Sequence, residues 1–505
     1  MFNLIAFAQR VFKTIFWIPL SVGNMKLEST NNAENSATAS VLFACLFNIM
    51  AVVIGNYDYR HRVEFEVISN VLWQFIFTLI IIATIGILVL LCLLYKSWPQ
   101  LCFRYQTEAD SSSKLQLGFL WTFGLLLIVK NSLAISGKIE CFMATPSVRE
   151  IESTAYLFVK IVFLTVQMAL ISCTWNLRIK WPSWVMYIVG IVMLANVSIW
   201  YKQFLSLISE TQPNNFRNSS ETELSENISD FFRCYRQTKI YKFNSKWKCF
   251  LLQISLHFLL LTTKFFRRAW TSTPDPLQDN HSQSCDLKIP NFKKVKIAAC
   301  VLGIVLNTPL LLVGLLLRFT ILHRTFLQNT LNLMKILQKG GLLLLILVAF
   351  SSIDMNKKNQ YVRHIDINDT LVLLCVVGKI VVHAMELFTA VYCFDNIVLC
   401  LKGLISLVFD FYHTMYILIS RRLSKIALNQ SSISVFVHVL MFIVNIIEWV
   451  IVTFILSLNG TYVVDEGQNC LFNGPLVWPI IQYIAIPFTL VYDFQSAMYF
   501  YSASL

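Results

Sequence analysis

Side chains that can take up or release protons lie inside segments that are otherwise apolar. A charge near the middle of a membrane span costs at least about 2.5–3.5 kcal/mol, so such a side chain usually faces a bundle interior or a wet cavity. The number of titratable groups, spread along the chain, suits proton handling better than a single ligand pocket. The ionisable and amide side chains at this depth are Lys130, Lys160, Gln167, Asn196, His257, Lys335, Lys379, His383, Glu386, Asp410, His413, His438, Asn445, Glu448, Gln482, Asp493 and Gln495.

Each of these side chains also has a structural interpretation. It could form a hydrogen bond between helices, worth about 0.6 kcal/mol, or be a long side chain that reaches the membrane surface from a span end. Lys160 and Lys402 are expected near span ends, where the second interpretation is strongest. His257, Glu448 and Asp493 lie deeper, which favours a functional role more than elsewhere.

His383 and Glu386 are three residues apart, so on a helix they share one face. That spacing fits a local salt link and a proton-exchanging pair equally well. Asp410, at mid-depth in the following apolar run, joins them as a secondary candidate.

The elements that must position these residues follow from composition. The chain has 505 residues, of which 56% are hydrophobic and only 14% charged, whereas soluble domains carry about 25% charged residues. Apolar runs of about twenty residues recur, and each could cross roughly 30 Å of hydrocarbon as a helix. The runs lack the alternation of a membrane barrel, so helices must satisfy the backbone in lipid. We expect an all-α polytopic membrane protein.

Twelve spans in two six-helix halves are expected. A polar stretch at 271–294 predicts a cytosolic linker between an N-terminal half at 40–270 and a C-terminal half at 295–505. Residues 1–39 precede the first span, and their apolar residues recur at helical spacing, which indicates an interfacial helix. The spans are predicted near 40–56, 68–95, 115–137, 154–176, 183–208, 249–268, 295–317, 327–352, 370–391, 395–419, 434–457 and 476–499.

Basic residues set the orientation. They cluster after the sixth span, at Arg267 and Arg268, and after the tenth, at Arg421 and Arg422. Because cytosolic loops carry the excess of Lys and Arg, both termini are expected in the cytosol of a plasma-membrane protein. The net charge of +13 is explained by this topology, so no nucleic-acid partner is expected.

Glycosylation motifs agree with that orientation. The topology places three asparagines of glycosylation motifs in outside loops, namely Asn218, Asn227 and Asn459. Asn368 and Asn429 also match the motif but fall inside, so the motif alone is weak evidence.

Neither the spacing of the cysteines nor any common enzyme motif indicates catalytic or metal chemistry. The thirteen cysteines show no spacing typical of a zinc site. Cys141, Cys234 and Cys470 are expected in outside loops, where a disulfide is compatible with the topology but its pairing cannot be assigned. No phosphate-binding loop, nucleophile elbow or metalloprotease motif occurs, so neither an enzyme nor a cofactor is expected.

A repeated motif suggests internal duplication. Asn196 with Trp200 and Asn445 with Trp449 form Asn-x-x-x-Trp in the fifth span of each half. The four-residue spacing puts both side chains on one helix face. The same match in equivalent spans is typical of an internal repeat.

The order of motifs from the fourth span onward resembles the otopetrin family of proton-selective channels. The fourth span has the family's Phe-x-x-x-Gln-Met, the sixth reads FLLQISLHFLLL and continues to a Trp, and the tenth ends in a basic pair. Spans one to three match only in hydropathy. The matching residues are Gln167, Asn196, Trp200, Trp270, Arg421, Arg422, Asn445, Trp449, Pro487, Tyr492 and Ser496.

The departures from the family are informative. His257 occupies the glutamate position of the sixth span, and Asp493-Phe494-Gln495 replaces the family's Arg-x-His in the twelfth. Glu448 stands where an aliphatic residue is usual, and His413 lies near one of the family's glutamines in the tenth span. We expect a divergent member in which gating, pH range or conduction itself is altered.

The resemblance implies a homodimer that external acid opens and zinc blocks, in contact with membrane lipid that can include a sterol. It also implies a set of proton-pathway candidates, to which Asp410, His383 and Glu386 are added as secondary ones. For His257 our hypothesis is a place in the first-half vestibule that shifts the acid range, the alternative being a packing histidine. The pathway candidates are Gln167, Asn196, His257, His413, Asn445, Glu448, Tyr492, Asp493 and Gln495.

Two other functions remain open. A proton-coupled secondary transporter also has two halves with buried His, Asp and Glu. Against it, Pro309 and Pro487 are expected to break spans of the second half only, without matching breaks in the first. A non-conducting chemoreceptor or scaffold is favoured by the charge reversal at Asp493.

The orientation predicts glycosylation at Asn218 or Asn227, because the transferase acts only on the lumenal side. Digestion with a glycosidase should increase the gel mobility of the expressed protein, and Asn218→Gln with Asn227→Gln should remove that shift. Protection of the 209–248 loop from external protease in intact cells would contradict the orientation.

Overall fold

The computed structural model describes most of the predicted spans. The predicted first span at 40–56, the segment 1–39, the three expected glycosylation sites Asn218, Asn227 and Asn459, and residues 271–291 of the predicted linker lie outside the described residues. The described residues are 65–103, 112–142, 148–175, 178–179, 183–211, 234–235, 237–270, 292–319, 324–352, 367–394, 396–422, 432–453, 470–471 and 477–504.

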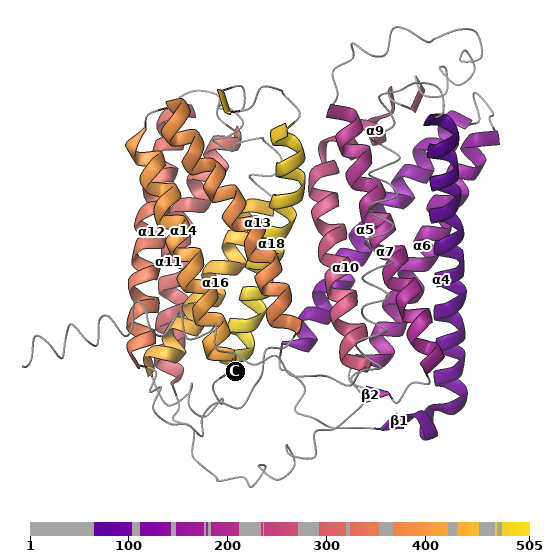
Figure 1. Cartoon of the computed structure of the whole chain (residues 1–505), viewed down its shortest axis with the longest axis horizontal. Helices are drawn as coiled ribbons and strands as arrows, with labels where there is room; N and C mark the ends of the chain where they lie inside the picture. The colour runs from indigo at the N-terminus through magenta and orange to yellow at the C-terminus, as the bar shows by residue number, and fades with distance from the viewer. Residues whose placement is uncertain are drawn as a thin grey trace, which may run out of the picture. The chain divides into compact units, whose positions relative to one another are not determined.

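The described helices form two compact units, the first between residues 29 and 279 and the second between 280 and 505. Figure 1 shows each unit as a bundle of long helices. The first unit contains α4 (Phe65–Leu101), α5 (Ser113–Phe142), α6 (Val148–Thr174), α7 (Ser183–Thr211), α9 (Lys239–Lys246) and α10 (Lys248–Trp270). The second contains α11 (Lys293–Phe319), α12 (Arg324–Ser352), α13 (Ile367–Thr389), α14 (Ile397–Arg422), α16 (Ser432–Ile451) and α18 (Val477–Ser504).

Some described segments depart from plain α-helix. The strands β1 (Cys102–Phe103) and β2 (Arg178–Ile179) form a two-residue antiparallel pair that hydropathy did not predict. A single π-helical turn, η7 (Ala390–Phe394), follows α13 directly. Such turns are frequent at functional sites, and this one ends the helix that carries His383 and Glu386.

The protein is a multi-pass helical membrane protein. Among the described residues, 8 helices are long and apolar enough to cross a membrane. They are α4, α5, α6, α11, α12, α13 with η7, α14 and α16. The apolar part of α10, Phe250–Phe266, is shorter. The spans assigned to α7, α10 and α18, and so the total of twelve, stay predictions.

Polar side chains inside these helices bond to their own backbone. Thr84 donates to the carbonyl oxygen of Ile80 at 2.7 Å, and Thr489 to that of Ala485 at 2.9 Å. Such bonds one turn back let hydroxyl side chains enter a membrane span without an unsatisfied group.

The expectation that two prolines break their spans is wrong. Pro309 lies inside α11 and Pro487 inside α18, and both helices continue past them. Proline is tolerated in membrane helices because neighbouring groups satisfy the freed backbone.

Five pairs of helices pack in the same way in both units. In the first, α5 packs against α6, α4 against α6 and α7, and α10 against α5 and α7. In the second, α13 packs against α14, α12 against α14 and α16, and α18 against α13 and α16. When the predicted spans are numbered from one to six within each half, these contacts join the same pairs of spans in both halves. This agreement supports the internal duplication that the Asn-x-x-x-Trp motifs suggested.

Two disulfides occupy equivalent places in the units. Cys141 at the end of α5 pairs with Cys234 before α9, and Cys393 in η7 pairs with Cys470 before α18. Their Cα atoms are 5.9 and 6.0 Å apart. All four cysteines fall on the side that the basic residues assign to the exterior, where disulfides persist. The pairing could not be assigned from sequence.

Loss of the second disulfide should destabilise the protein. Cys393→Ser should lower the free energy of unfolding by about 2–5 kcal/mol, seen as a lower melting temperature in detergent. Cys400→Ser, at a free cysteine of α14, is the control and should melt like the wild type. Alkylation of Cys393 and Cys470 as free thiols in unreduced protein would contradict the pairing.

Candidate functional site

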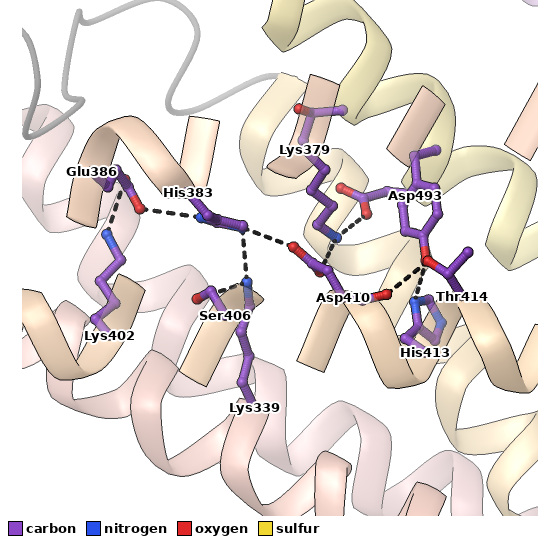
Figure 2. A network of polar contacts seen from close by, with 12 residues as sticks. Lys339, Lys379, His383, Glu386, Lys402, Ser406, Asp410, His413, Thr414 and Asp493 are labelled. Carbon is purple, nitrogen blue, oxygen red and sulfur yellow. Dashed lines mark hydrogen bonds and ion pairs between the residues drawn. The ribbon is translucent and has the colours of Figure 1, made fainter. Parts of the chain in front are cut away.

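A run of polar contacts starts where α13 meets η7. Nζ of Lys402 on α14 lies 3.1 Å from Oε1 of Glu386, and Oε2 of Glu386 lies 3.2 Å from Nδ1 of His383 (Figure 2). Glu386 and Lys402 are both buried. A buried carboxylate requires such compensation, and the Lys402–Glu386 pair holds α14 against α13.

The other nitrogen of His383 faces two competing partners. Its Nε2 lies 3.3 Å from Nζ of Lys339 on α12 and 3.4 Å from Oδ2 of Asp410 on α14. Lys339 also donates to Oγ of Ser406 at 3.2 Å. An ammonium only donates and a carboxylate only accepts. His383 Nε2 therefore accepts from Lys339 when it carries no proton and can donate to Asp410 when it carries one.

Lys379 on α13 lies between two carboxylates. Its Nζ is 2.5 Å from Oδ1 of Asp493 on α18 and 3.5 Å from Oδ1 of Asp410. All three side chains are at most 1% exposed. Within the described part of the chain, Asp410 has no hydrogen bond within normal distance on either oxygen. Both carboxylate oxygens can therefore accept a hydrogen bond from a donor that approaches them.

A glycine brings these helices together. Gly378 precedes Lys379, and a Cβ there would lie 2.8 Å from the backbone oxygen of Ala485 on α18. Because only a residue without a side chain permits this approach, Gly378 sets the α13–α18 spacing that places Lys379 next to Asp493.

Beyond this ion pair runs a directional hydrogen-bond chain. Thr414 donates to the backbone oxygen of Asp410 at 2.7 Å, so the hydroxyl of Tyr492, 2.7 Å from Thr414 Oγ1, donates to it. Tyr492 then accepts from Nδ1 of His413 at 2.9 Å. Nε2 of His413 accepts from the amide of Asn445 at 3.3 Å. These partners assign His413 the neutral form with the proton on Nδ1.

A small polar cavity borders the charged groups. Its volume is about 50 Å³, and one water needs roughly 10–15 Å³, so a few waters fit. A second cavity of about 20 Å³ shares Lys335 and Glu448 with it. The ionisable residues that line the larger cavity are Lys335, Lys339, Lys379, His383, Glu386, Lys402, Glu448 and Asp493.

The charges in and beside this cavity balance. With Asp410 included, four lysines face four carboxylates, and His383 is the additional titratable group. Buried charges persist when they are paired in this way. We call these residues the charge network: Lys335, Lys339, Lys379, His383, Glu386, Lys402, Asp410, Glu448 and Asp493.

The structure brings most of the sequence candidates together, all in the second unit. Glu448 lines the cavity, while Gln495 lies two residues past Asp493, which turns it to another face of α18. The candidates in direct contact are His383, Glu386, Asp410, His413, Asn445, Tyr492 and Asp493.

Three of the sequence candidates, Gln167, Asn196 and His257, belong to the first unit. The amide of Gln167 is fully buried on α6 with no hydrogen bond among the described residues. Asn196 donates to a backbone oxygen one turn earlier at 3.1 Å. His257 bonds through Nδ1 to a backbone oxygen one turn earlier at 2.9 Å, and Phe123 lies edge-on to it at 5.5 Å. These contacts favour packing roles, and the His257 hypothesis stays a prediction.

Two lysines that were expected near span ends are buried inside helices. Lys402 was expected to reach the membrane surface, yet it is buried and paired with Glu386. Lys160 was expected near a span end, yet it is buried well inside α6. A signal existed for Lys402, because Lys402, Ser406 and Asp410 recur every four residues on one face of α14.

Lys379→Met should destabilise the protein because it leaves Asp410 and Asp493 without their shared cation. Removal of one partner from a buried ion pair costs about 3–5 kcal/mol. Adding Asp493→Asn should restore part of that loss, which a melting curve in detergent would show. Lys96→Met, at an exposed lysine of α4, is the control. Equal melting of Lys379→Met and Lys96→Met would contradict the pairing.

Comparison with known proteins adds no family. No family model matches the chain, and no curated protein matches it. The otopetrin resemblance therefore depends on the ordered motifs alone.

Proposed function

We propose that this protein is an otopetrin-like, proton-selective channel that external acid opens, and that its second unit carries the protons. The observation that carries the proposal is the continuous set of contacts from Lys402 through Glu386, His383 and Asp410 to the Lys379–Asp493 pair. Proton relays in membrane proteins are built from Asp, Glu and His that face a bundle interior.

His383 is the transfer point in this mechanism. A proton that water in the cavity beside Glu386 delivers to Nε2 breaks the bond accepted from Lys339 and creates a bond donated to Asp410. Asp410 can accept that proton, after which Nε2 again accepts a hydrogen bond from Lys339. The groups that face His383 are Glu386 on its own helix, Lys339 from α12 and Asp410 from α14.

The hydrogen-bond chain supplies the next stage. Waters in the cavity beside Lys379 and Asp493 can carry the proton past the ion pair. Tyr492 extends from that region, its ring 5.0 Å from Lys379 Nζ, to a hydroxyl at His413. The hydrogen bonds run from Asn445 through His413 and Tyr492 to Thr414, so transfer of a proton to His413 requires the hydroxyl of Tyr492 to turn and donate to Nδ1.

Cavity size favours protons over a solute. Pockets for organic ligands usually measure about 300–1,000 Å³, whereas the larger cavity here is about 50 Å³. A proton-coupled carrier that bound its substrate at the charge network would need more room there, which supports the channel over such a carrier.

The resemblance extends the proposal to the rest of the protein. It implies a plasma-membrane homodimer, inhibited by zinc and in contact with lipid that can include a sterol. The two disulfides support a topology in which the ends of α5 and η7 face the exterior. Entry near Glu386 is then external, as acid opening requires.

A non-conducting relative is the second candidate. The balance of four lysines against four carboxylates would hold the second unit together without moving any ion. The same recording separates the two functions.

A step to acidic external solution should evoke an inward current whose reversal potential follows the proton gradient. Replacing sodium or chloride should leave it unchanged, and millimolar zinc should reduce it. Asp410→Asn, which removes the acceptor for His383, should abolish it, whereas the exposed control Lys96→Met should not.

A reversal potential that follows sodium would refute proton selectivity. Absence of any acid-evoked current from protein shown to be at the cell surface would favour the non-conducting relative.

A further inference from the structure

A second polar cluster lies further along α14, beyond His413. The hydroxyl of Tyr416 is 3.2 Å from Nε2 of His438 on α16, and the hydroxyl of Tyr499 donates to Oγ of Ser420 at 2.7 Å. Arg421 lies 4.9 Å above the ring of Tyr499. This inner cluster is near the ends of α14 and α16 that the topology assigns to the cytosol, and the proposed mechanism has not used it.

The ring of Phe500 lies between the hydrogen-bond chain and the inner cluster. It stacks on His413 with ring centroids 5.5 Å apart and planes 25° apart. It also lies 5.7 Å from the ring of His438 and 6.2 Å from that of Tyr416. Phe500 is fully buried. The ring of Phe500 therefore contacts His413 of the hydrogen-bond chain, and also His438 and Tyr416 of the inner cluster.

A second phenylalanine ring stacks on His413. Phe409 stacks on it with centroids 5.3 Å apart and planes 12° apart. Both ring nitrogens of His413 are engaged by Tyr492 and Asn445. Among the described residues, no hydrogen bond therefore leads from His413 toward Tyr416, and apolar rings stack on the imidazole. Apolar constrictions of this kind close channels by excluding water.

We infer that Phe500 is the barrier that closes the proton path between His413 and the inner cluster of Tyr416 and His438. The inference rests on the proposed proton conduction and adds the residue that limits it. Displacement of the ring would let water join the two polar groups.

The position of Phe500 also connects the barrier to the charge network. Asp493 and Phe500 are seven residues apart on α18, which puts them two turns apart on the same face. Asp493 is held by Lys379. Protonation that loosens this pair would release α18 to move, and the ring of Phe500 would move with it.

The test replaces Phe500 and compares it with a matched phenylalanine. Phe494 lies on the same helix, is equally buried, and packs on Trp449 with ring centroids 5.6 Å apart. Phe500→Ala should raise the standing proton current at neutral external pH about tenfold, equivalent to a barrier lower by about 1.4 kcal/mol. Phe500→Leu should give a smaller rise, and Phe494→Ala should conduct like the wild type. Surface labelling verifies expression of each variant, and Phe500→Leu serves as the test if Phe500→Ala does not reach the surface.

The outcomes separate the barrier from the proposed function. A leak in Phe500→Ala that disappears on adding Asp410→Asn supports the barrier, even if the wild type is silent. A wild-type current that needs Asp410 but is unchanged in both Phe500 variants overturns the barrier and leaves proton conduction standing. An equal leak in Phe494→Ala also overturns it, because disturbed packing would then be the cause. Silence of the wild type and both Phe500 variants overturns both.

Discussion

The ion pair of Lys379 with Asp493, with Asp410 beside it, is the constraint on which the second unit depends. A charge buried in a membrane protein without a partner is costly, so α13, α14 and α18 must stay where this lysine reaches both carboxylates. Gly378 permits the required approach of α13 to α18. The position of Tyr492, the residue before Asp493, then follows, and with it the chain that ends at His413 and Asn445.

The two units share helix packing and disulfide positions but differ in chemistry. The shared features are what a duplicated bundle retains, because they depend on where helices touch rather than on polar side chains. In the first unit the candidates Asn196 and His257 bond to their own helix backbone. In the second unit, His383, Asp410 and Asp493 bond across helices. Cross-helix bonds can exchange partners without unfolding a turn, which supports the proposal that the second unit moves protons.

The sequence predicted the helices well and the contacts poorly, for physical reasons. Apolar runs such as those of α13 and α14 are dictated by the membrane, which is why their ranges agree with prediction. The partner of Lys379 is 114 residues away, and no local pattern specifies which helix faces which. Lys402 was misjudged because a lysine near a span end can extend either to water or to a buried acid. The choice depends on which side chain lies beside it in the fold, and here that side chain is Glu386. The turn η7 has no recognised sequence signature, and the cysteine pairs required the fold.

Proton flux through the purified protein tests the central claim most directly. The protein would be reconstituted into liposomes that contain a pH-sensitive dye, with a potassium gradient and valinomycin supplying the driving potential. The account predicts internal acidification faster than in protein-free liposomes, unaffected by the choice of external sodium or chloride, and lost in His383→Ala protein. Acidification at the protein-free rate, or equal rates with and without His383, would contradict a proton path through the charge network.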